Sequence, residues 1–356
     1  MITRLIQFAL AQRVFILILA ALLSGMGWYA FQQIPIDAFP DVASTQVKII
    51  LKAPGMTPEE VENRVAVPIE TEMLGIPKQE MLRTTVKYGI VDITLTFNDG
   101  TDIYWARQQV AERLSGVMSD LPSTLEGGMA PITTPLGEMF QFTVDNPNMS
   151  LMERKSLLDW VIRPALRTVS GVADVNVLGG VSRSYEVVPD PVRMTAAGIT
   201  IDVLKAKIEA NNRNDGAGRL REGGEVLLVR SEGNITSLDD LRAIVIKVDG
   251  MTPVRISDVA EVRIGEMTRN GVVTESGKGE AVEGLVLGLA GANARQVVAG
   301  VEHKITELMP SLPKGTKLSV FYNRASLVDK AVGAVTQSLG EAIVLVLILL
   351  GVFLGN

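Results

Sequence analysis

The sequence predicts an α+β membrane protein, and three observations lead to that prediction. An uncharged stretch, residues 14–36, exceeds the ~20 apolar residues that a helix needs to cross a bilayer. A second apolar stretch covers residues 342–356, and the segment between the two has the composition of ordinary soluble protein. That segment contains an internal repeat with the order β-α-β-β-α-β, which is typical of a ferredoxin-like unit. We therefore expect an N-terminal transmembrane helix, two ferredoxin-like repeats, of which the second is interrupted by an inserted α+β subdomain, and the start of a second transmembrane helix.

The first apolar stretch is expected to be a membrane anchor. Arg4 and Arg13 precede it, and Trp28 and Tyr29 lie near its exit, where aromatic residues suit the bilayer interface. The stretch is longer than the apolar part of a secretory signal, and no small-x-small cleavage site follows it. Both observations favour an anchor over the alternative, a cleaved signal peptide. Because basic residues stay on the cytoplasmic side, the N-terminus is expected in the cytoplasm. The soluble part then lies in the periplasm of a double-membrane bacterium.

One half of the repeat appears at a shift of 191 residues. At this shift, the residues Val110, Met118, Leu121 and Pro122 fall on Val301, Met309, Leu312 and Pro313. Both copies carry apolar residues at helical spacing before a Leu-Pro pair. In each copy, an apolar run typical of a strand precedes this helical pattern. We therefore expect an equivalent strand and helix in each copy.

The other half of the repeat appears at a shift of 91 residues, at which residues 47–51 fall on 138–142 and residues 81–86 fall on 172–177. Two different shifts imply an insertion of about 100 residues, the size of a small domain. Segments 139–180 and 281–322 should then form a single sheet. The expected boundaries are 1–33 for an amphipathic start and the first transmembrane helix, 44–135 for the first ferredoxin-like subdomain, 136–180 and 271–325 for the second, 181–270 for the insert, and 336–356 for the incomplete second transmembrane helix.

The insert has secondary-structure signals of its own. Strands are expected at residues 184–188, 244–248 and 259–264, and helices at residues 201–210 and 238–243. The stretch Asn211–Gly224 is rich in glycine and polar residues, which predicts an exposed loop or a long hairpin. In the repeats, Pro68 and Pro164 stand inside helical patterns, and both are expected to kink their helices because proline has no backbone N–H.

Composition and motifs argue against an enzyme and against a nucleic-acid partner. The net charge is −6, and no basic face of the required density is visible. The chain has no cysteine and a single histidine, so thiolate zinc sites and the H-E-x-x-H motif are excluded. Phosphate-binding loops and the G-x-S-x-G motif are also absent from the sequence. His303, beside Lys304, reads as a solvated surface residue. We expect no catalytic residue and no cofactor.

Five groups of residues stand out as motifs. They are Ile34–Asp41; Ala53–Glu62 with Val67–Glu70; Asp99–Asp102 with Trp105–Arg107; Gly171–Val175 with Gly179–Gly180; and Phe353–Asn356. Together these residues resemble the inner-membrane efflux pumps of the resistance–nodulation–division superfamily, in particular the heavy-metal efflux branch. The resemblance spans the whole chain, which corresponds to only part of the usual length of a family member.

The resemblance implies the N-terminal portion of a proton-driven efflux permease, a cation/proton antiporter for a divalent ion such as zinc, cobalt, cadmium or nickel. Family members are homotrimers of the bacterial inner membrane that work with a periplasmic adaptor protein and an outer-membrane channel. Their ferredoxin-like repeats form pore or porter subdomains, and the insert forms half of a docking crown. Residues 211–224 match a hairpin that reaches into the neighbouring protomer, where Arg219–Glu222 could form ion pairs or stay a solvated loop. The family's proton-relay carboxylates belong to membrane helices that this sequence does not include.

Glu138 and Asp174 are the candidate metal ligands. Aspartate is depleted in strands, and alternation places Asp174 on the face opposite to Val175. From the spacing alone, a solvated sheet face is the alternative explanation. In family members that export zinc, cobalt and cadmium, the matching residues contribute carboxylates to a site in the periplasmic cleft, so the resemblance implies a role as metal ligands. Such ions accept carboxylate oxygens; here the ion would be the substrate, and its remaining ligands would come from outside this sequence.

Three other functions remain open at this point. A copper or silver exporter would use soft thioether ligands, and four methionines surround the same strand and helix, namely Met129, Met139, Met149 and Met152. An exporter of drugs or other amphiphiles lines its cleft with phenylalanines, of which the first half of the second copy has only Phe140 and Phe142. A membrane-anchored periplasmic binding or scaffold protein is the alternative from a different class.

Overall fold

The structure is a computed structural model that describes residues 8, 11–33, 43–134, 136–212, 215–222, 225–231, 233–249, 252–269 and 271–354. The motif at residues 34–41 lies outside the described residues. The chain divides into two compact units, and each is described by itself. One unit comprises Met1–Val144, Trp160–Val177 and Glu283–Asn356, and the other comprises Asp145–Asp159 and Leu178–Val282.

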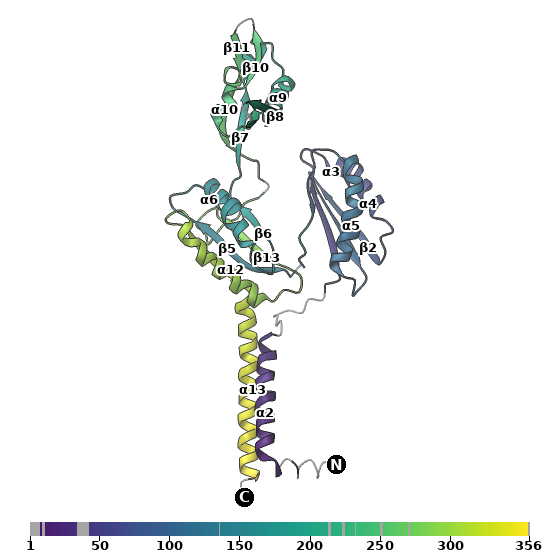
Figure 1. The fold of residues 1–356 in the computed structure, drawn as a ribbon, viewed down its shortest axis with the longest axis vertical. Coiled ribbons are helices and arrows are strands. Elements are labelled where there is room, and N and C mark those ends of the chain that lie inside the picture. The colour runs from purple at the N-terminus through teal and green to yellow at the C-terminus, as the bar shows by residue number, and fades with distance from the viewer. Residues whose placement is uncertain are drawn as a thin grey trace. The chain divides into compact units, whose positions relative to one another are not determined.

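The first soluble part of the chain is a four-stranded antiparallel sheet with the order β2-β3-β1-β4. Its strands are β1 (Gln46–Lys52), β2 (Gln79–Lys87), β3 (Ile90–Phe97) and β4 (Glu126–Met129). Three helical segments connect β1 to β2, namely α3 (Pro58–Val61), η1 (Glu62–Ala66) and α4 (Val67–Met73), and α5 (Ile103–Val117) with η2 (Met118–Asp120) connects β3 to β4. Figure 1 shows α3, α4 and α5 on one face of this sheet.

The alternation of the strands and the spacing of the helices build the core of this part. In β1, every second residue is fully buried, Val47, Ile49 and Leu51, as expected where one face of a strand is covered. Helix α5 buries a stripe at helical spacing, Ala106, Val110, Leu114 and Val117. The helix begins after Asp102, whose side chain accepts a hydrogen bond of 2.7 Å from the backbone N–H of Trp105 and thereby caps the first turn.

A second four-stranded sheet has the order β14-β5-β13-β6. Its strands are β5 (Glu138–Asp145), β6 (Val172–Gly179), β13 (Val282–Gly288) and β14 (Lys317–Asn323). Between β5 and β6 lie α6 (Leu151–Leu157), η3 (Leu158–Ile162) and α7 (Arg163–Leu166), and between β13 and β14 lie α12 (Ala294–Leu308) and η4 (Met309–Ser311). Both sheets therefore place their strands in the order fourth, first, third, second. Strands from either side of the insert pair in one sheet, as the sequence predicts.

Each sheet has a connecting helix with a π-helical turn just before a proline. In the first, the N–H of Val67 donates to the carbonyl of Glu62, five residues back, and Pro68 follows. Pro68 has no N–H to donate to the carbonyl four residues back, so the wider turn absorbs the defect. Segment η3 ends at Ile162, and Pro164 stands two residues later. The two prolines that the sequence places inside helical patterns thus follow π turns.

The second compact unit contains three antiparallel strand pairs and a core of its own. The pairs are β7 (Arg183–Pro189) with β12 (Ala260–Glu266), β10 (Val245–Asp249) with β11 (Thr252–Arg255), and β8 (Asp215–Glu222) with β9 (Glu225–Ser231). Its helices in the insert are α8 (Pro191–Ala196), α9 (Ile201–Ala210), α10 (Leu238–Ala243) and α11 (Ile256–Val259). Buried Leu204, Leu241 and Ile256 belong to the core. The five expected elements are present, and the glycine-rich stretch contributes the first strand of a hairpin.

The closing helix is longer than the sequence pattern indicates. Helix α13 runs from Arg324 to Leu354, twelve residues earlier than the expected start at 336. The first part of the helix contains polar residues such as Asp329 and Lys330, so a hydropathy pattern does not mark it, although these residues are compatible with a helix. Within the described ranges, one helix is long and apolar enough to cross a membrane, Arg324–Phe353, whereas the sequence pattern indicates an incomplete transmembrane helix over 336–356. Helix α2 (Arg13–Gln33) covers most of the first apolar stretch, but its described apolar part, Arg13–Gly27, is shorter than a membrane span.

Candidate functional site

Asp174 is the better-defined of the two candidate ligands. It is the third residue of β6, and the next residue, Val175, is fully buried in the core. The side chain of Asp174 is only 14% exposed. A carboxylate in such a place needs strong hydrogen-bond donors, because burial without partners would favour its neutral form.

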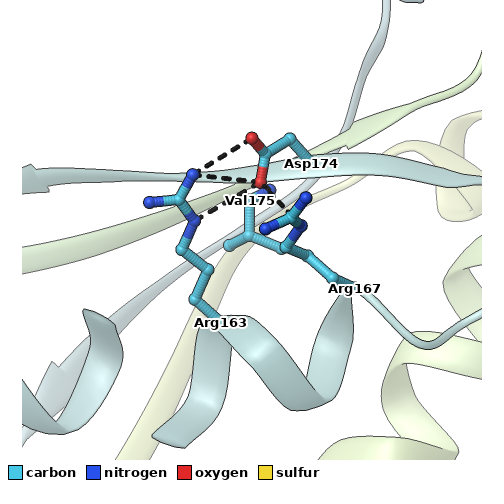
Figure 2. Close-up of polar contacts among 4 residues, drawn as sticks. All are labelled: Arg163, Arg167, Asp174 and Val175. Atoms are coloured by element: carbon cyan, nitrogen blue, oxygen red, sulfur yellow. Dashed lines mark hydrogen bonds and ion pairs between the residues drawn. The ribbon is translucent and has the colours of Figure 1, made fainter. Parts of the chain in front are cut away.

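Two arginines and one backbone amide supply those donors (Figure 2). The guanidinium of Arg163 donates through Nη2 to Oδ2 at 3.0 Å and to Oδ1 at 3.2 Å, and through Nε to Oδ1 at 3.3 Å. The Nε atom of Arg167 lies 3.3 Å from Oδ1. The backbone N–H of Val175 donates to the same oxygen at 2.7 Å. The carboxyl group of Asp174 therefore faces two guanidinium groups and one backbone N–H.

The local sequence explains why both arginines reach this carboxylate. Arg163 is the first residue of α7 and Arg167 caps its end, so the two side chains are four residues apart and lie on the same side of this turn. After α7 the chain must turn sharply into β6, and Gly171 makes this turn with φ +85°. A Cβ atom at Gly171 would lie 2.6 Å from Cγ2 of Val297. Only glycine fits this turn without displacing Val297.

Glu138, the second candidate, is the first residue of β5 and is exposed. Its Oε2 atom accepts a hydrogen bond of 2.8 Å from Nε2 of Gln141. The backbone around it is held firmly: the carbonyl of Leu136 accepts a hydrogen bond from Arg324, and the carbonyl of Gly137 accepts one of 2.8 Å from the N–H of Gly288. Glu138 is thus an accessible carboxylate on a fixed strand end.

A third carboxylate, Glu283 on β13, was missed by the sequence analysis. Burial raises the pKa of Glu283 above its ordinary value, and the negative charge of nearby Glu138 adds to that rise. The signal was available, because a glutamate interrupts the apolar run 281–289.

The candidate residues do not form a complete metal site within this chain. Strand β13 lies between β5 and β6 in the sheet, so the strands of Glu138 and Asp174 are not neighbours. Across the described ranges, no three histidine or acidic side chains come together as a metal ion requires. The two candidates instead have separate surroundings, an arginine pair for Asp174 and a second carboxylate for Glu138.

The residues behind the rival interpretations are largely structural. Phe140 and Phe142 are fully buried, with ring centroids 6.1 Å apart. Met139 is 4% exposed, and it fills the space that a side chain at Gly288 would need, since an added Cβ would meet its Cε at 2.4 Å. His303 is exposed, as expected. The side chains of Arg219–Glu222 lie outside the described part of β8.

The chain belongs to the AcrB/AcrD/AcrF family, whose sequence profile matches residues 5–356. It is 39% identical to the cation efflux system protein CzcA of Alcaligenes sp. strain CT14, over 100% of this chain and 34% of that protein. The cobalt-zinc-cadmium resistance protein CzcA of Cupriavidus metallidurans is 38% identical with the same coverage. The cation efflux system protein CusA of Escherichia coli K12 is 35% identical, over 99% of this chain and 34% of that protein.

The fold is also similar to a solved structure. The crystal structure of a heavy metal efflux pump matches with a TM-score of 0.89 at 32% identity, over 99% of this chain and 36% of the pump. The chain therefore spans about a third, 34%, of the length of the curated relatives that it matches.

Proposed function

We propose that this chain is the N-terminal part of a proton-driven efflux pump for a divalent heavy-metal cation, with zinc, cobalt, cadmium and nickel as the candidate ions. One observation supports this most strongly: a heavy metal efflux pump has the same fold over 99% of this chain, with a TM-score of 0.89. The relatives named for cobalt, zinc and cadmium resistance support the choice of ion. The pump is a transporter and not an enzyme.

The two sheets are proposed to be the cores of two ferredoxin-like subdomains, residues 44–135 and residues 136–180 with 271–325. The shared strand order, fourth, first, third, second, supports this assignment, because it is the order of a split β-α-β unit. The insert, residues 181–270, is proposed to be the docking subdomain. Its β8–β9 hairpin is the candidate for a contact with a neighbouring protomer in a homotrimer.

The proposed setting is the inner membrane, with the soluble parts in the periplasm. Helices α2 and α13 are the candidate transmembrane segments. Arg4 and Arg13 favour a cytoplasmic N-terminus. A periplasmic adaptor protein and an outer-membrane channel are the proposed partners, and the metal ion is the substrate.

Glu138 and Asp174 are proposed to be ligands of the transported ion. Carboxylates match divalent zinc, cobalt and cadmium better than monovalent copper or silver. The methionine beside Glu138 supports the same choice, because Met139 is buried against Gly288 and is used as packing. Two carboxylates leave a tetrahedral or octahedral shell incomplete, so the remaining ligands are assigned to the rest of the pump.

The test is metal tolerance in cells that lack other exporters and express the complete pump. Glu138→Gln and Asp174→Asn should each lower tolerance to zinc, cobalt and cadmium, and the double variant should behave like a strain without the pump. Tolerance to silver should not change. Asp92→Asn is the matched control, because Asp92 is also a strand carboxylate with a basic partner, Lys48 at 3.7 Å. Unchanged zinc, cobalt and cadmium tolerance in the double variant, at equal expression, would remove both residues from the transport path.

A further inference from the structure

Four nitrogen atoms crowd Oδ1 of Asp174, and one donates to Oδ2. Atom Oδ1 accepts hydrogen bonds from Nε and Nη2 of Arg163 and from the N–H of Val175, and it forms an ion pair with Nε of Arg167. Atom Oδ2 accepts a hydrogen bond from Nη2 of Arg163. A carboxylate offers about four acceptor positions in total. A metal ion can therefore reach Asp174 only through the second lone pair of Oδ2, beside the Nη2 atom of Arg163, and bidentate coordination requires a guanidinium to move away.

The local charge also opposes a metal ion in this arrangement. One carboxylate faces two guanidinium groups, which stay protonated at any pH relevant to a protein. The cluster therefore carries a net positive charge, and a divalent cation would be repelled until the arginines swing out. Removal of the guanidinium charge should make the carboxylate more available to a cation.

The arginines are the movable half of the cluster. Their side chains are 34% and 55% exposed, against 14% for Asp174. Asp174 is fixed by its strand and by the backbone N–H of Val175. The released guanidinium groups can be solvated by water, whereas the mostly buried carboxylate needs a new positive partner, which a metal ion supplies. Long arginine side chains can therefore turn into water while the carboxylate stays in place.

The fold itself does not need this cluster. At the shift of 91 residues, Asp174 falls on Arg83 of the first sheet, which has the same strand order without a carboxylate there. The corresponding helix in the first sheet also has a π turn and a proline, but it starts with Val67 in place of an arginine. The same strand order is therefore reached without this cluster.

We propose that Arg163 and Arg167 are built-in competitors of the transported cation: they hold Asp174 in the metal-free protein, and a divalent ion must compete with their two positive charges for its carboxylate. The competition lowers the affinity of the site, so that the ion can leave again, as transport requires. The arginines are positioning residues, since they act through Asp174. This inference rests on the proposed function, because it needs Asp174 to be a metal ligand.

The test is calorimetric titration of the complete pump in detergent with zinc chloride. Arg163→Gln with Arg167→Gln should bind zinc at least ~10-fold more tightly than the natural protein, a change equal to about 1.4 kcal/mol. Arg163→Lys, which keeps the charge but not the forked geometry, should lie between the two. Arg263→Gln is the matched control, because Arg263 makes a comparable pair with Glu186 at 3.2 Å in the insert, and it should not change the affinity.

A transport measurement separates this role from a structural one. In vesicles, the double arginine variant should show a lower KM for zinc together with a lower kcat, because tighter binding slows release. Asp174→Asn should abolish the gain in affinity when it is added to the double variant. If the double variant does not fold, the same zinc affinity, KM and kcat are measured for Arg167→Gln alone, and changes in the same directions are expected.

The outcomes distinguish the inference from the proposed function. Equal or weaker zinc binding in the folded arginine variants, with binding still lost in Asp174→Asn, overturns the competition and leaves the proposed ligand in place. Zinc binding that Asp174→Asn does not change overturns both.

Discussion

The two four-stranded sheets share one strand order and one helix irregularity, but they differ in charge. At the shift of 91 residues, Glu138 and Asp174 of the second sheet fall on Val47 and Arg83 of the first. Val47 is fully buried in the first core. The same topology is thus built with and without the carboxylates. The carboxylates are therefore not demanded by the strand order.

The two cores are also filled from different strands. At the shift of 191 residues, Gly284 and Gly288 of β13 fall on Ile93 and Phe97 of β3. In the second sheet, a side chain of β5 fills the space that these glycines leave. The ring of Phe142 lies where a side chain at Gly284 would be, since an added Cβ would meet it at 2.4 Å. Equal packing density with different residues is what a close-packed interior allows.

The largest expected effect tests whether both cores matter equally. Phe97→Ala and Phe142→Ala each remove a fully buried ring, and each should cost about 3–5 kcal/mol of unfolding free energy. Urea unfolding of the purified chain in detergent, followed by tryptophan fluorescence, measures this. Phe321→Ala, at a residue that is 57% exposed, should change stability by less than about 0.5 kcal/mol. A negligible cost for one of the two buried rings would show that its sheet is not independently packed.

The glycine at the centre of the second sheet gives a smaller effect that is specific to that sheet. Gly284→Ala should cost about 1–3 kcal/mol because its methyl group overlaps the ring of Phe142. Phe142→Leu in the same chain should recover part of this loss. Gly116→Ala is the control: it lies in α5 with open space around it, and it should be neutral or stabilising by up to about 1 kcal/mol. If Gly284→Ala were harmless, the account of how the second core is filled would be wrong.

The helix starts should respond alike in both parts. Thr57 and Glu60 form a capping box before α3, and Ser150 and Glu153 form one before α6. Thr57→Ala and Ser150→Ala should each lower the unfolding free energy by about 1 kcal/mol. Ser115→Ala, whose hydroxyl is exposed on α5, is the neutral control. A cost confined to one box would mean that the two helices are not equivalent.

These boxes also predict a loss of stability in acid. Hydrogen bonds from the backbone and side chain of Thr57 hold the pKa of Glu60 below its ordinary value, and Ser150 does the same for Glu153. A lowered folded pKa contributes stability that is present above the unfolded value and is lost as pH falls through the folded pKa. Thermal melts at decreasing pH should show a smaller loss in Thr57→Ala and Ser150→Ala than in the natural chain. An unchanged pH profile would contradict the capping geometry.

The smallest effects should have opposite signs in the two sheets. At the shift of 191 residues, Glu283 falls on Asp92, which has Lys48 as a partner at 3.7 Å. The pKa of Glu283 is raised by burial and by Glu138, so its charge costs stability as pH rises through its unfolded pKa. Glu283→Gln should therefore raise the Tm at pH 7 but not at pH 4. Asp92→Asn should lower the Tm slightly or not at all, since exposed pairs contribute about 0–1 kcal/mol. A lower Tm for Glu283→Gln at pH 7 would contradict this difference.

Sequence periodicity and the internal repeat predict most of the helices and strands. The features that they do not predict depend on contacts between those helices and strands. The helix of residues 294–308 starts after Asn293, which falls on Asp102 at the shift of 191, and both residues cap their helices. Such local signals are readable from sequence. The pairing of Asp174 with Arg163 and Arg167 is not, because it depends on how far the π turn and Pro164 rotate the last helical turn. The early start of α13 was missed since hydropathy marks only its apolar part.

The most direct test of the central claim is X-ray absorption at the zinc edge, measured on the complete pump loaded with one equivalent of zinc. The zinc ion should have a first shell of oxygen or nitrogen atoms at about 2.0–2.2 Å. The double variant Glu138→Gln with Asp174→Asn should change or abolish this shell. Arg83→Gln, in the first sheet, should leave it intact. Sulfur neighbours at about 2.3 Å, or a shell that the double variant leaves unaltered, would contradict the central claim.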